Sequence, residues 1–458
     1  MNSSARSEVL NKMLLPPQKS LSIRDFGAVA DGIADNTQVF KNAIEQCYKN
    51  NGDKIIVPAG TYLTGPIHLK SNINLHLDEG TVILLGDNLD EWPPIKSRWE
   101  GVECYGYSPC IYGENLKNVS ITGAGTIDGR GRAWWNEFKR RKTNGQTQPI
   151  SARDKEFAVL NKNTNLSDCG GGGIGSFFFR PPLIQFNNCS NVLLDGFTTS
   201  NSPFWNTHLV YCSNVIVKNT TFQNPSDGIN GDGLDIDSCS EVQVFDCTFD
   251  VNDDCLCFKS GIGKDGMRVN KPCQNIVVKN CKMLRGHGSV VMGSETAGNI
   301  RNIEISDCTF NDTDRGIRIK SRRGRAGTVE NITFNNITMN SVGCPISMNL
   351  YYECGVRPEE IAALSDRNAR PVTETTPCIK NIKITNITAY NAQIAAAFLL
   401  GLPEKPIENV LFENVKITLA KDGVAGFPDM AFGVKKMQGQ GIVAEFVKDF
   451  VQKNVCIE

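Results

Sequence analysis

From about residue 118 the chain repeats one short phrase, in which a polar residue precedes a β-branched residue and apolar and polar residues then alternate. The phrase begins at Asn118, Asn191, Asn214, Glu241, Asn275, Asn302, Asn331, Asn381 and Asn409, and most consecutive copies are 23 to 34 residues apart. Alternation with a period of two indicates short strands. Strands at this spacing, with no helices between them, predict an all-β fold, a single-stranded right-handed parallel β-helix.

Alignment of the copies on the β-branched residue gives two columns of small or apolar side chains, as expected for stacks that point into a coil. The first column holds Cys189, Cys212, Cys239, Cys273, Ile300, Val329, Ile379 and Ile407. The second holds Phe197, Thr220, Cys247, Cys281, Cys308, Ile337, Ile387 and Val415. Seven of the 17 cysteines fall in these columns. Free cysteine packs as a small hydrophobic residue, so we expect reduced core thiols and neither disulfides nor a metal site.

The segments outside the repeat predict covers and long loops. Asp35 is a suitable N-cap for an amphipathic helix that would protect the open end of the β-helix. Residues 129–180 interrupt the repeat over a length that is typical of lids, binding walls or disordered loops. Their Trp134–Trp135 pair suits sugar stacking and loop packing equally. A second amphipathic helix is expected near Ile442–Val451.

These features divide the chain into three parts. We expect an N-terminal arm over 1–22, a β-helix domain over 23–420 with the insertion at 129–180, and a C-terminal cover over 421–458. The long loops would line a cleft on the β-helix.

The bulk composition excludes several classes of partner. The net charge is −1, so no global field attracts nucleic acid. No apolar run approaches the ~18 residues of a membrane span, so no membrane partner is expected. Met1–Leu15 lacks the apolar core of a signal peptide, which together with reduced cysteines predicts a cytoplasmic location. A secreted or periplasmic protein whose signal peptide has been removed is the alternative, and the oligomeric state stays open.

Three aspartates in two short motifs carry the strongest chemical signal. Asp232 lies in an Asn-Gly-Asp-Gly-Leu-Asp run, and Asp253 and Asp254 lie in Asn-Asp-Asp-Cys, 21 residues further on. That spacing is about one coil, so the motifs should lie side by side. Clustered carboxylates raise one another's pKa, and hydrolysis of a glycosidic bond needs one protonated carboxyl beside ionised ones. Adjacent residues of a regular strand face opposite ways, so joint action of Asp253 and Asp254 requires a bend.

Basic and aromatic residues recur at coil-like intervals after the aspartates. His287 lies between two glycines, Arg318 and Lys320 flank Ile319, and Tyr352 follows. The strand period puts both cations on the outer face and Ile319 in the core. Two such cations beside carboxylates suit an anionic substrate, although they would also suit a solvated surface.

Two further groups of charged residues favour structural roles. Asp235 and Asp237 are expected to be solvated or turn residues. The basic run of Arg322, Arg323 and Arg325 is typical of a solvated turn, from which one arginine could reach a substrate carboxylate.

In order and spacing, these motifs resemble the signatures of the polygalacturonases, glycoside hydrolase family 28, over nearly the whole chain. The resemblance implies a parallel β-helix and inverting hydrolysis of α-1,4-galacturonosidic bonds without a cofactor. It implies that Asp253 is the general acid and that Asp232 and Asp254 activate water. The substrate would be a galacturonate-containing oligosaccharide or polysaccharide.

The same resemblance implies roles for the remaining motif residues. His287 would hold the protonation and geometry of the acid. Asn230 would contribute to substrate binding, Arg318 and Lys320 would bind the galacturonate carboxylate, and Tyr352 would lie near the same subsite. The family motif usually has threonine where this chain has Gly231, from which we expect altered backbone freedom without loss of activity.

The long stretch between Asp253 and His287, together with the 129–180 insertion, resembles the exo-acting branch of the family. Rhamnogalacturonan or xylogalacturonan hydrolysis is the main alternative, although rhamnogalacturonan-cleaving relatives typically lack the histidine. A polysaccharide lyase would need Ca²⁺ and would form an unsaturated product. An adhesin or tailspike-like binding module would not need the aspartates.

Overall fold

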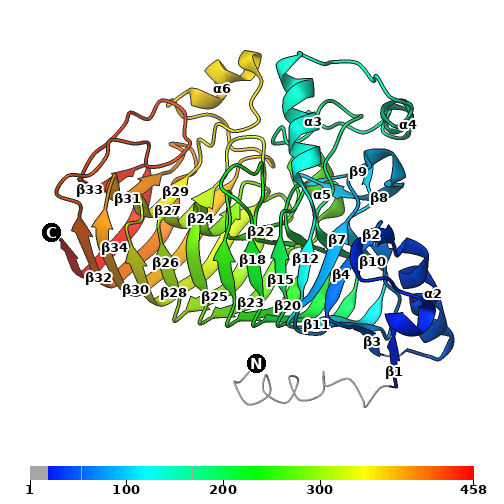
Figure 1. Ribbon diagram of the computed structural model, residues 1–458. Helices are drawn as coiled ribbons and strands as arrows, with labels where there is room; N and C mark the ends of the chain where they lie inside the picture. The colour runs from blue at the N-terminus through cyan, green and yellow to red at the C-terminus, as the bar shows by residue number, and fades with distance from the viewer. Residues whose placement is uncertain (1–18, 53, 168) are drawn as a thin grey trace.

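The strands stack in parallel into a right-handed β-helix, as the repeat predicts (Figure 1). The computed structural model describes residues 19–52, 54–167 and 169–458. Most of the expected N-terminal arm, including Met1–Leu15, lies outside the described residues. Thirty-two of the described strands belong to one continuous ladder. None of the described helices is long and apolar enough to cross a membrane.

One sheet of the β-helix carries the predicted functional motifs. Its strands are β5 (Ile67–His68), β10 (Ile111–Glu114), β13 (Ile184–Asn187), β16 (Thr207–Val210), β19 (Leu234–Asp237), β22 (Leu256–Lys259), β24 (Lys282–Gly293), β27 (Thr313–Lys320), β29 (Cys344–Asn349), β31 (Ala395–Leu400) and β33 (Gln440–Glu445). We refer to it as the site sheet. Each strand pairs in parallel with the equivalent strand of the next coil, so outward side chains form columns along the β-helix.

The opposite wall is a longer sheet built from the repeat phrases. Its strands are β1 (Ser20–Ser22), β3 (Lys54–Val57), β6 (Asn74–Leu77), β11 (Lys117–Gly123), β14 (Ser190–Asp195), β17 (Ser213–Lys218), β20 (Ser240–Phe245), β23 (Cys273–Lys279), β25 (Ile300–Ser306), β28 (Thr328–Asn340), β30 (Cys378–Ala392), β32 (Ile407–Leu419) and β34 (Val447–Ile457). Shorter strands continue each coil: β2 (Asp31–Asp35), β4 (Gly60–Thr64), β7 (Thr81–Leu85), β12 (Thr126–Asp128), β15 (Thr198–Ser200), β18 (Thr221–Gln223), β21 (Thr248–Asp250) and β26 (Thr309–Asn311).

The two predicted inward columns form the core. Every member of both columns is buried, and Cys273, Ile300, Val329 and Ile379 are paired from strand to strand. All seventeen cysteines are free thiols, and several buried ones donate to backbone carbonyls of the neighbouring coil. The interpretation of the column cysteines as core thiols is therefore confirmed.

The polar residue that opens each phrase has a left-handed backbone, with φ between 53° and 59° from Asn118 to Asn409. Asparagine tolerates this conformation better than most residues. The side chains also hydrogen-bond one another between coils; Asn191 donates to Asn118 at 2.8 Å and Asn214 donates to Asn191 at 2.6 Å. The repeat therefore encodes both a turn and a ladder along the outside of the β-helix.

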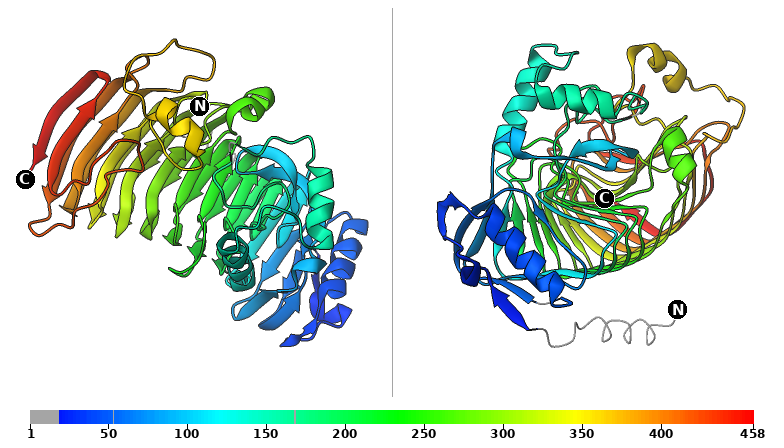
Figure 2. Two further views of the ribbon diagram at one scale, coloured as in Figure 1. Left: turned by 90° about the horizontal axis from the view of Figure 1, so that it is seen from above. Right: turned by 90° about the vertical axis from the view of Figure 1, so that its right-hand side faces the viewer.

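The two ends of the β-helix are closed differently. Helix α2 (Thr37–Lys49) covers the N-terminal end and buries Phe40, Ala43, Ile44 and Cys47, as expected (Figures 1 and 2). Its N-cap is Asn36, one residue after the predicted Asp35, although the Asp35 side chain accepts from the backbone N–H of Thr37 at 2.9 Å. The helix expected over Ile442–Val451 is wrong: these residues lie in β33 and β34, which extend the two sheets by one coil.

The insertions gather on one side of the β-helix, above the site sheet in the view of Figure 1. They include the antiparallel hairpin of β8 (Pro94–Trp99) and β9 (Val102–Tyr107) and the helices α3 (Arg132–Thr143), α4 (Ala152–Leu160), α5 (Gly263–Val269) and α6 (Ile361–Ser365). Trp134 and Trp135 are buried within this layer, where Trp134 packs edge-on against Trp92 and Tyr107. The tryptophan pair therefore packs the insertion.

Candidate active site

All eight residues singled out in the sequence line one pocket of about 220 Å³ over the site sheet. They are Asn230, Asp232, Asp253, Asp254, His287, Arg318, Lys320 and Tyr352. The aspartates lie in loops that precede β19 and β22, His287 and the two cations lie on β24 and β27, and Tyr352 follows β29. Stacking of successive coils thus brings together residues separated by more than a hundred positions.

The two acidic motifs lie side by side, because Leu234 is opposite Leu256 in the register of β19 and β22. A carboxylate oxygen of Asp232 lies within 4.8 Å of one of Asp254. Asp253 and Asp254 precede the regular strand in a bend, where the Asp253 carboxylate accepts from the backbone N–H of Asp254 at 3.0 Å. This bend lets both adjacent carboxylates face the same pocket.

Asp254 is held between two cations. Lys320 Nζ lies 2.6 Å from Asp254 Oδ2, and Arg318 Nη1 lies 3.2 Å from Asp254 Oδ1. Burial would raise the pKa of Asp254, but Lys320 and Arg318 outweigh it and hold that pKa well below its usual range. Asp254 is therefore an ionised carboxylate.

Asp232 has the opposite electrostatic environment. Burial raises its pKa well above the usual value, and the negative charges of Asp235 and Asp253 raise it further. Lys259 opposes this shift, but its Nζ lies 3.8 Å from Asp232 and is shared with Asp235 and Glu295 at 3.4 and 3.6 Å. The neighbouring carboxyls of Asp232 and Asp254 therefore differ strongly in their affinity for a proton.

His287 contacts the remaining aspartate, with 3.5 Å between its Nδ1 and Asp253 Oδ1. A hydrogen bond to Asp253 raises the pKa of His287 above 6.5, and partial desolvation of the half-exposed ring opposes this shift. The flanking glycines permit this approach: a Cβ on Gly286 would lie 2.6 Å from the Asp253 carbonyl, and one on Gly288 would lie 2.9 Å from Asp254 Oδ1. The Gly-His-Gly sequence thus reflects close packing against the aspartate loop.

The His287 contact predicts a pH-dependent contribution to stability. Because the folded-state pKa is raised, the contribution is fully present below the ordinary value of 6.5 and is lost as pH rises through the raised pKa. We expect His287→Gln to lower the free energy of unfolding more at about pH 6 than at about pH 9. Urea unfolding of both proteins at the two pH values measures this, and a loss that is equal or larger at high pH would contradict it.

Comparisons with known proteins agree with this arrangement. The family model described as glycosyl hydrolases family 28 matches residues 179–427, and a model described as rhamnogalacturonase A/epimerase, pectate lyase-like, matches residues 20–83. A probable polygalacturonase of Vitis vinifera is 30% identical over 88% of this chain and 74% of its own length. The chain belongs to glycosyl hydrolase family 28.

Two further relatives are described as exo-acting. The exo-poly-alpha-D-galacturonosidase of Dickeya chrysanthemi is 26% identical over 87% of this chain and 67% of its own length. A hyperthermoactive exopolygalacturonase from Thermotoga maritima, known from a crystal structure, is 29% identical in sequence. The two structures superpose with a TM-score of 0.79, and the match covers 99% of this chain and 96% of that chain. The protein is accordingly a glycoside hydrolase.

Sequence reasoning missed Asp429, which the family 28 site of this chain receives from a loop near the C-terminus. Asp429 Oδ1 accepts from Arg318 Nε and Nη2 at 3.1 and 2.8 Å, and Asp429 Oδ2 accepts from Ser347 and Asn349 at 2.6 and 2.7 Å. Arg318 is thereby fixed between two carboxylates. A lone aspartate outside the repeat gave no signal of this role.

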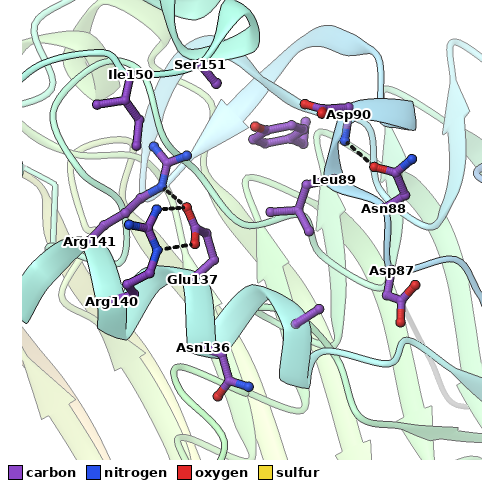
Figure 3. Close-up of a pocket in the computed structure, with 12 residues that line it drawn as sticks. Asp87, Asn88, Leu89, Asp90, Asn136, Glu137, Arg140, Arg141, Ile150 and Ser151 are labelled. Carbon is purple, nitrogen blue, oxygen red and sulfur yellow. Dashed lines mark hydrogen bonds and ion pairs between the residues drawn. The ribbon is translucent and has the colours of Figure 1, made fainter.

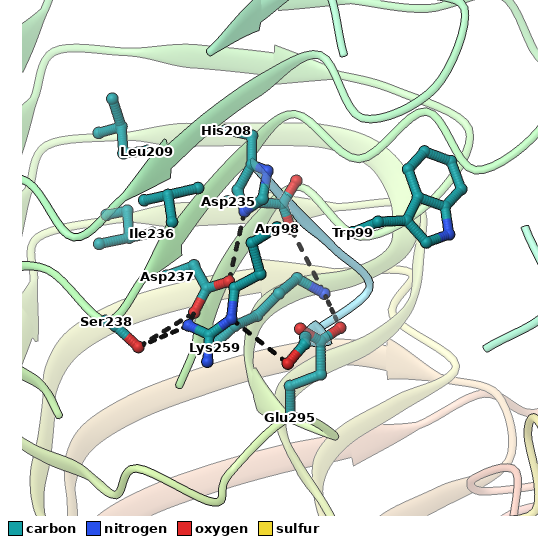
Figure 4. Close-up of polar contacts among 12 residues, drawn as sticks. Arg98, Trp99, His208, Leu209, Asp235, Ile236, Asp237, Ser238, Lys259 and Glu295 are labelled. Atoms are coloured by element: carbon teal, nitrogen blue, oxygen red, sulfur yellow. Dashed lines mark hydrogen bonds and ion pairs between the residues drawn. The ribbon is translucent and has the colours of Figure 1, made fainter. Parts of the chain in front are cut away.

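Asp235 and Asp237 are not solvated, contrary to the expectation from sequence. Both lie on β19 and are fully buried (Figure 4). Arg98 Nη1 of the β8–β9 hairpin donates to Asp237 at 2.8 Å, and Lys259 pairs with Asp235. This network anchors the hairpin to the site sheet, close to Asp232.

Gly231 is explained by packing and not by backbone freedom. Its φ lies outside the left-handed region, whereas a Cβ at this position would lie 2.0 Å from Asn224 Nδ2 and 2.4 Å from Asn252 Oδ1. A threonine at this position would require both amide side chains to move. Neighbouring Asn230 is held by Arg180, whose Nη2 donates to its side-chain oxygen at 2.6 Å.

Asp232, Asp254 and Cys257 offer donor atoms close enough together for a metal ion. Burial raises the pKa of the Cys257 thiol well above its usual value, which disfavours the thiolate that metals bind. Lys320 and Lys259 already supply positive charge to the two carboxylates. The donor set therefore suits acid–base chemistry better than a cation.

A larger pocket of about 630 Å³ lies between α3 and the loop at residues 87–90 (Figure 3). It contains none of the eight residues. Its central carboxylate, Glu137, is bound by Arg140 at 2.7 Å and by Arg141 at 2.6 Å. The charge of Glu137 is therefore compensated, and this pocket is separate from the one that holds the eight residues.

Proposed function

We propose that this enzyme hydrolyses α-1,4-galacturonosidic bonds of pectic oligosaccharides with inversion, and that it acts from a chain end. The observation that carries the proposal is the single pocket in which three aspartates meet a histidine and two fixed cations. The family and the substrates named for its relatives support galacturonan as the substrate.

Membership of the family and the positions of the three carboxyls suggest a division of labour. Asp253 faces the pocket beside His287 and is assigned as the general acid, which protonates the leaving glycosidic oxygen. Asp254, held ionised by Lys320 and Arg318, is assigned to accept a proton from the attacking water. Asp232 would orient that water with Asp254, because their oxygens lie within hydrogen-bonding reach of one small molecule.

The cationic side of the pocket suits recognition of a uronate. Arg318 and Lys320 lie 5.7 and 5.2 Å from the centre of the Tyr352 ring, so all three face one region. Asn230, positioned by Arg180, offers an amide to sugar hydroxyls. These eight residues lie within the proposed catalytic domain, residues 23–420, whereas Asp429 comes from the proposed C-terminal cover, residues 421–458.

Action from a chain end is supported by the walls of the pocket. Glu100 of the β8–β9 hairpin and Ile262, just before α5, both line it, and the N–H of Ile262 donates to the Gly101 carbonyl at 3.2 Å. The hairpin and the α5 segment thus join over one end. The volume, about 220 Å³, is below the roughly 300–1,000 Å³ of pockets that hold drug-sized ligands, which favours about one sugar ring at this end.

Mass-resolved product analysis on polygalacturonate tests the proposal. We expect release of galacturonate or another short unit from the first minutes, with little change in viscosity and no unsaturated product. Early oligomers of intermediate length and a rapid fall in viscosity would show internal cleavage. Ultraviolet-absorbing products that disappear with a chelator would instead identify a lyase.

We further propose that the enzyme works in a reducing compartment such as the cytoplasm. The free thiols support this, since Cys212 contacts the coils of both Cys189 and Cys239 without forming a disulfide. Cell fractionation with an activity assay measures the location, and activity recovered outside the cytoplasm would contradict the proposal.

A further inference from the structure

Arg325 is a buried cation at the closed end of the catalytic pocket. It lies in the loop after β27, is only 3% exposed, and lines the same pocket as Glu100 and Ile262. The carbonyl of the next residue, Ala326, accepts from the Thr296 hydroxyl at 2.7 Å, and the N–H of Ala297 donates to the Gly261 carbonyl at 2.9 Å, so this loop adjoins the α5 segment that closes the pocket. The sequence run in which it lies suggested a solvated turn, but the structure places it against the active site.

Among the residues that the structure describes, none forms an ion pair or a side-chain hydrogen bond with Arg325. Its Nε is buried without a partner. The other arginines of the run are engaged: Arg322 donates to the carbonyls of Cys354 and Gly355, and Arg323 forms a two-fold contact with Glu404 at 2.6 and 2.8 Å.

The other cations of the pocket are also committed. Arg318 donates from three nitrogens to Asp254 and Asp429. Lys320 is bound to Asp254, and Lys259 is shared among three carboxylates. Among the described residues that line the pocket, Arg325 is therefore the arginine or lysine without a carboxylate partner.

A buried charge without a partner is costly, and a planar carboxylate is the anion that a guanidinium binds best, through two parallel hydrogen bonds. The same pocket offers a matching acceptor. Glu295 Oε2 is buried without a hydrogen-bond partner and is suited to accept from a sugar hydroxyl. A carboxylate and a hydroxyl on one ring are the groups of a uronic acid.

We propose that Arg325 binds the carboxylate of the uronic acid unit at the closed end and thereby selects sugars with a free acid over esterified or neutral ones. This inference rests on the proposed function. Arg325 is a specificity residue for the closed end, whereas Arg318 and Lys320, which both bind Asp254, face the region beside Tyr352. Methyl esterification at this unit would leave the guanidinium unpaired.

The test compares wild type with Arg325→Gln on trigalacturonate and on its methyl ester. We expect Arg325→Gln to lower kcat/KM on the free acid by about 10- to 100-fold, mainly through KM, as for loss of a hydrogen bond to a charged group. The preference for free acid over ester should fall by the same factor. Arg323→Gln, on the same loop but paired with Glu404, is the matched control and should keep the wild-type preference.

Retention of the wild-type preference by Arg325→Gln would overturn the inference. A purely structural role would lower kcat/KM on the free acid and on the ester by the same factor and would leave the preference unchanged. If that variant does not fold, Arg325→Lys is the second test, because lysine keeps the charge but cannot donate two parallel hydrogen bonds to one carboxylate. Its preference for the free acid should be intermediate, and an unchanged preference would also overturn the inference. Failure of the wild type to cleave either galacturonide would instead overturn the proposed function, which separates the two failures.

Discussion

Replacement of Asp253 by asparagine is expected to lower kcat by about 10²- to 10⁴-fold, the usual contribution of a positioned general acid. Asparagine keeps the size of the side chain and can still accept from the backbone N–H of Asp254. It cannot deliver a proton to the leaving oxygen, so KM should change little while kcat falls. Steady-state kinetics on trigalacturonate measures both parameters.

Asp246→Asn is a suitable control for this substitution. Asp246 lies on the outside of the β-helix with a left-handed backbone and accepts from Asn280, so asparagine fits its position in the ladder. Its kinetics should match wild type. A near-normal kcat for Asp253→Asn would show that another group protonates the leaving oxygen.

Replacement of Asp429 by alanine is expected to destabilise the protein by about 3–5 kcal/mol, the usual effect of removing one partner from a buried ion pair. Arg318 is 1% exposed, and without Asp429 its buried charge would be paired with Asp254 alone. Ser347 and Asn349 would each lose a hydrogen-bond acceptor. Activity should also fall, because Arg318 would no longer be held against Asp254. Urea unfolding and kcat/KM measure the two effects.

Asp422→Ala provides the comparison, since Asp422 lies in the same C-terminal segment but is exposed. It should change the free energy of unfolding by less than about 0.5 kcal/mol. If Asp429→Ala were as stable and as active as Asp422→Ala, the pair with Arg318 would contribute neither to folding nor to the geometry of the site.

The β-helix and its inward columns could be predicted because each coil must satisfy the same local rules. A left-handed turn favours asparagine, and a buried stack admits only Cys, Ile, Val and similar residues. Since the rules recur at every coil, the register follows from the phrase itself. The eight predicted site residues share one pocket for the same reason: coil length converts sequence spacing into spatial proximity.

Features that depend on contacts across insertions could not be predicted. The sequence alone suggests that Asp235 and Asp237 are surface residues. In the structure, Arg98 of the β8–β9 hairpin compensates the charge of Asp237, and Lys259 pairs with Asp235. The partner of Arg318 lies 111 residues further along the chain. The strands β33 and β34 were mistaken for a helix because their exposed, charged residues obscure the strand alternation.

The contact between Asp429 and Arg318 also affects when the enzyme becomes functional during synthesis. A ribosome completes Asp232, Asp253, Asp254 and both cations well before it reaches residue 429. Until then Arg318 lacks one of its two counter-charges, and the site sheet lacks its final coil. A chain that ends before residue 429 would therefore carry the aspartates and both cations without the contact that fixes Arg318, and we expect it to be less active than the full chain.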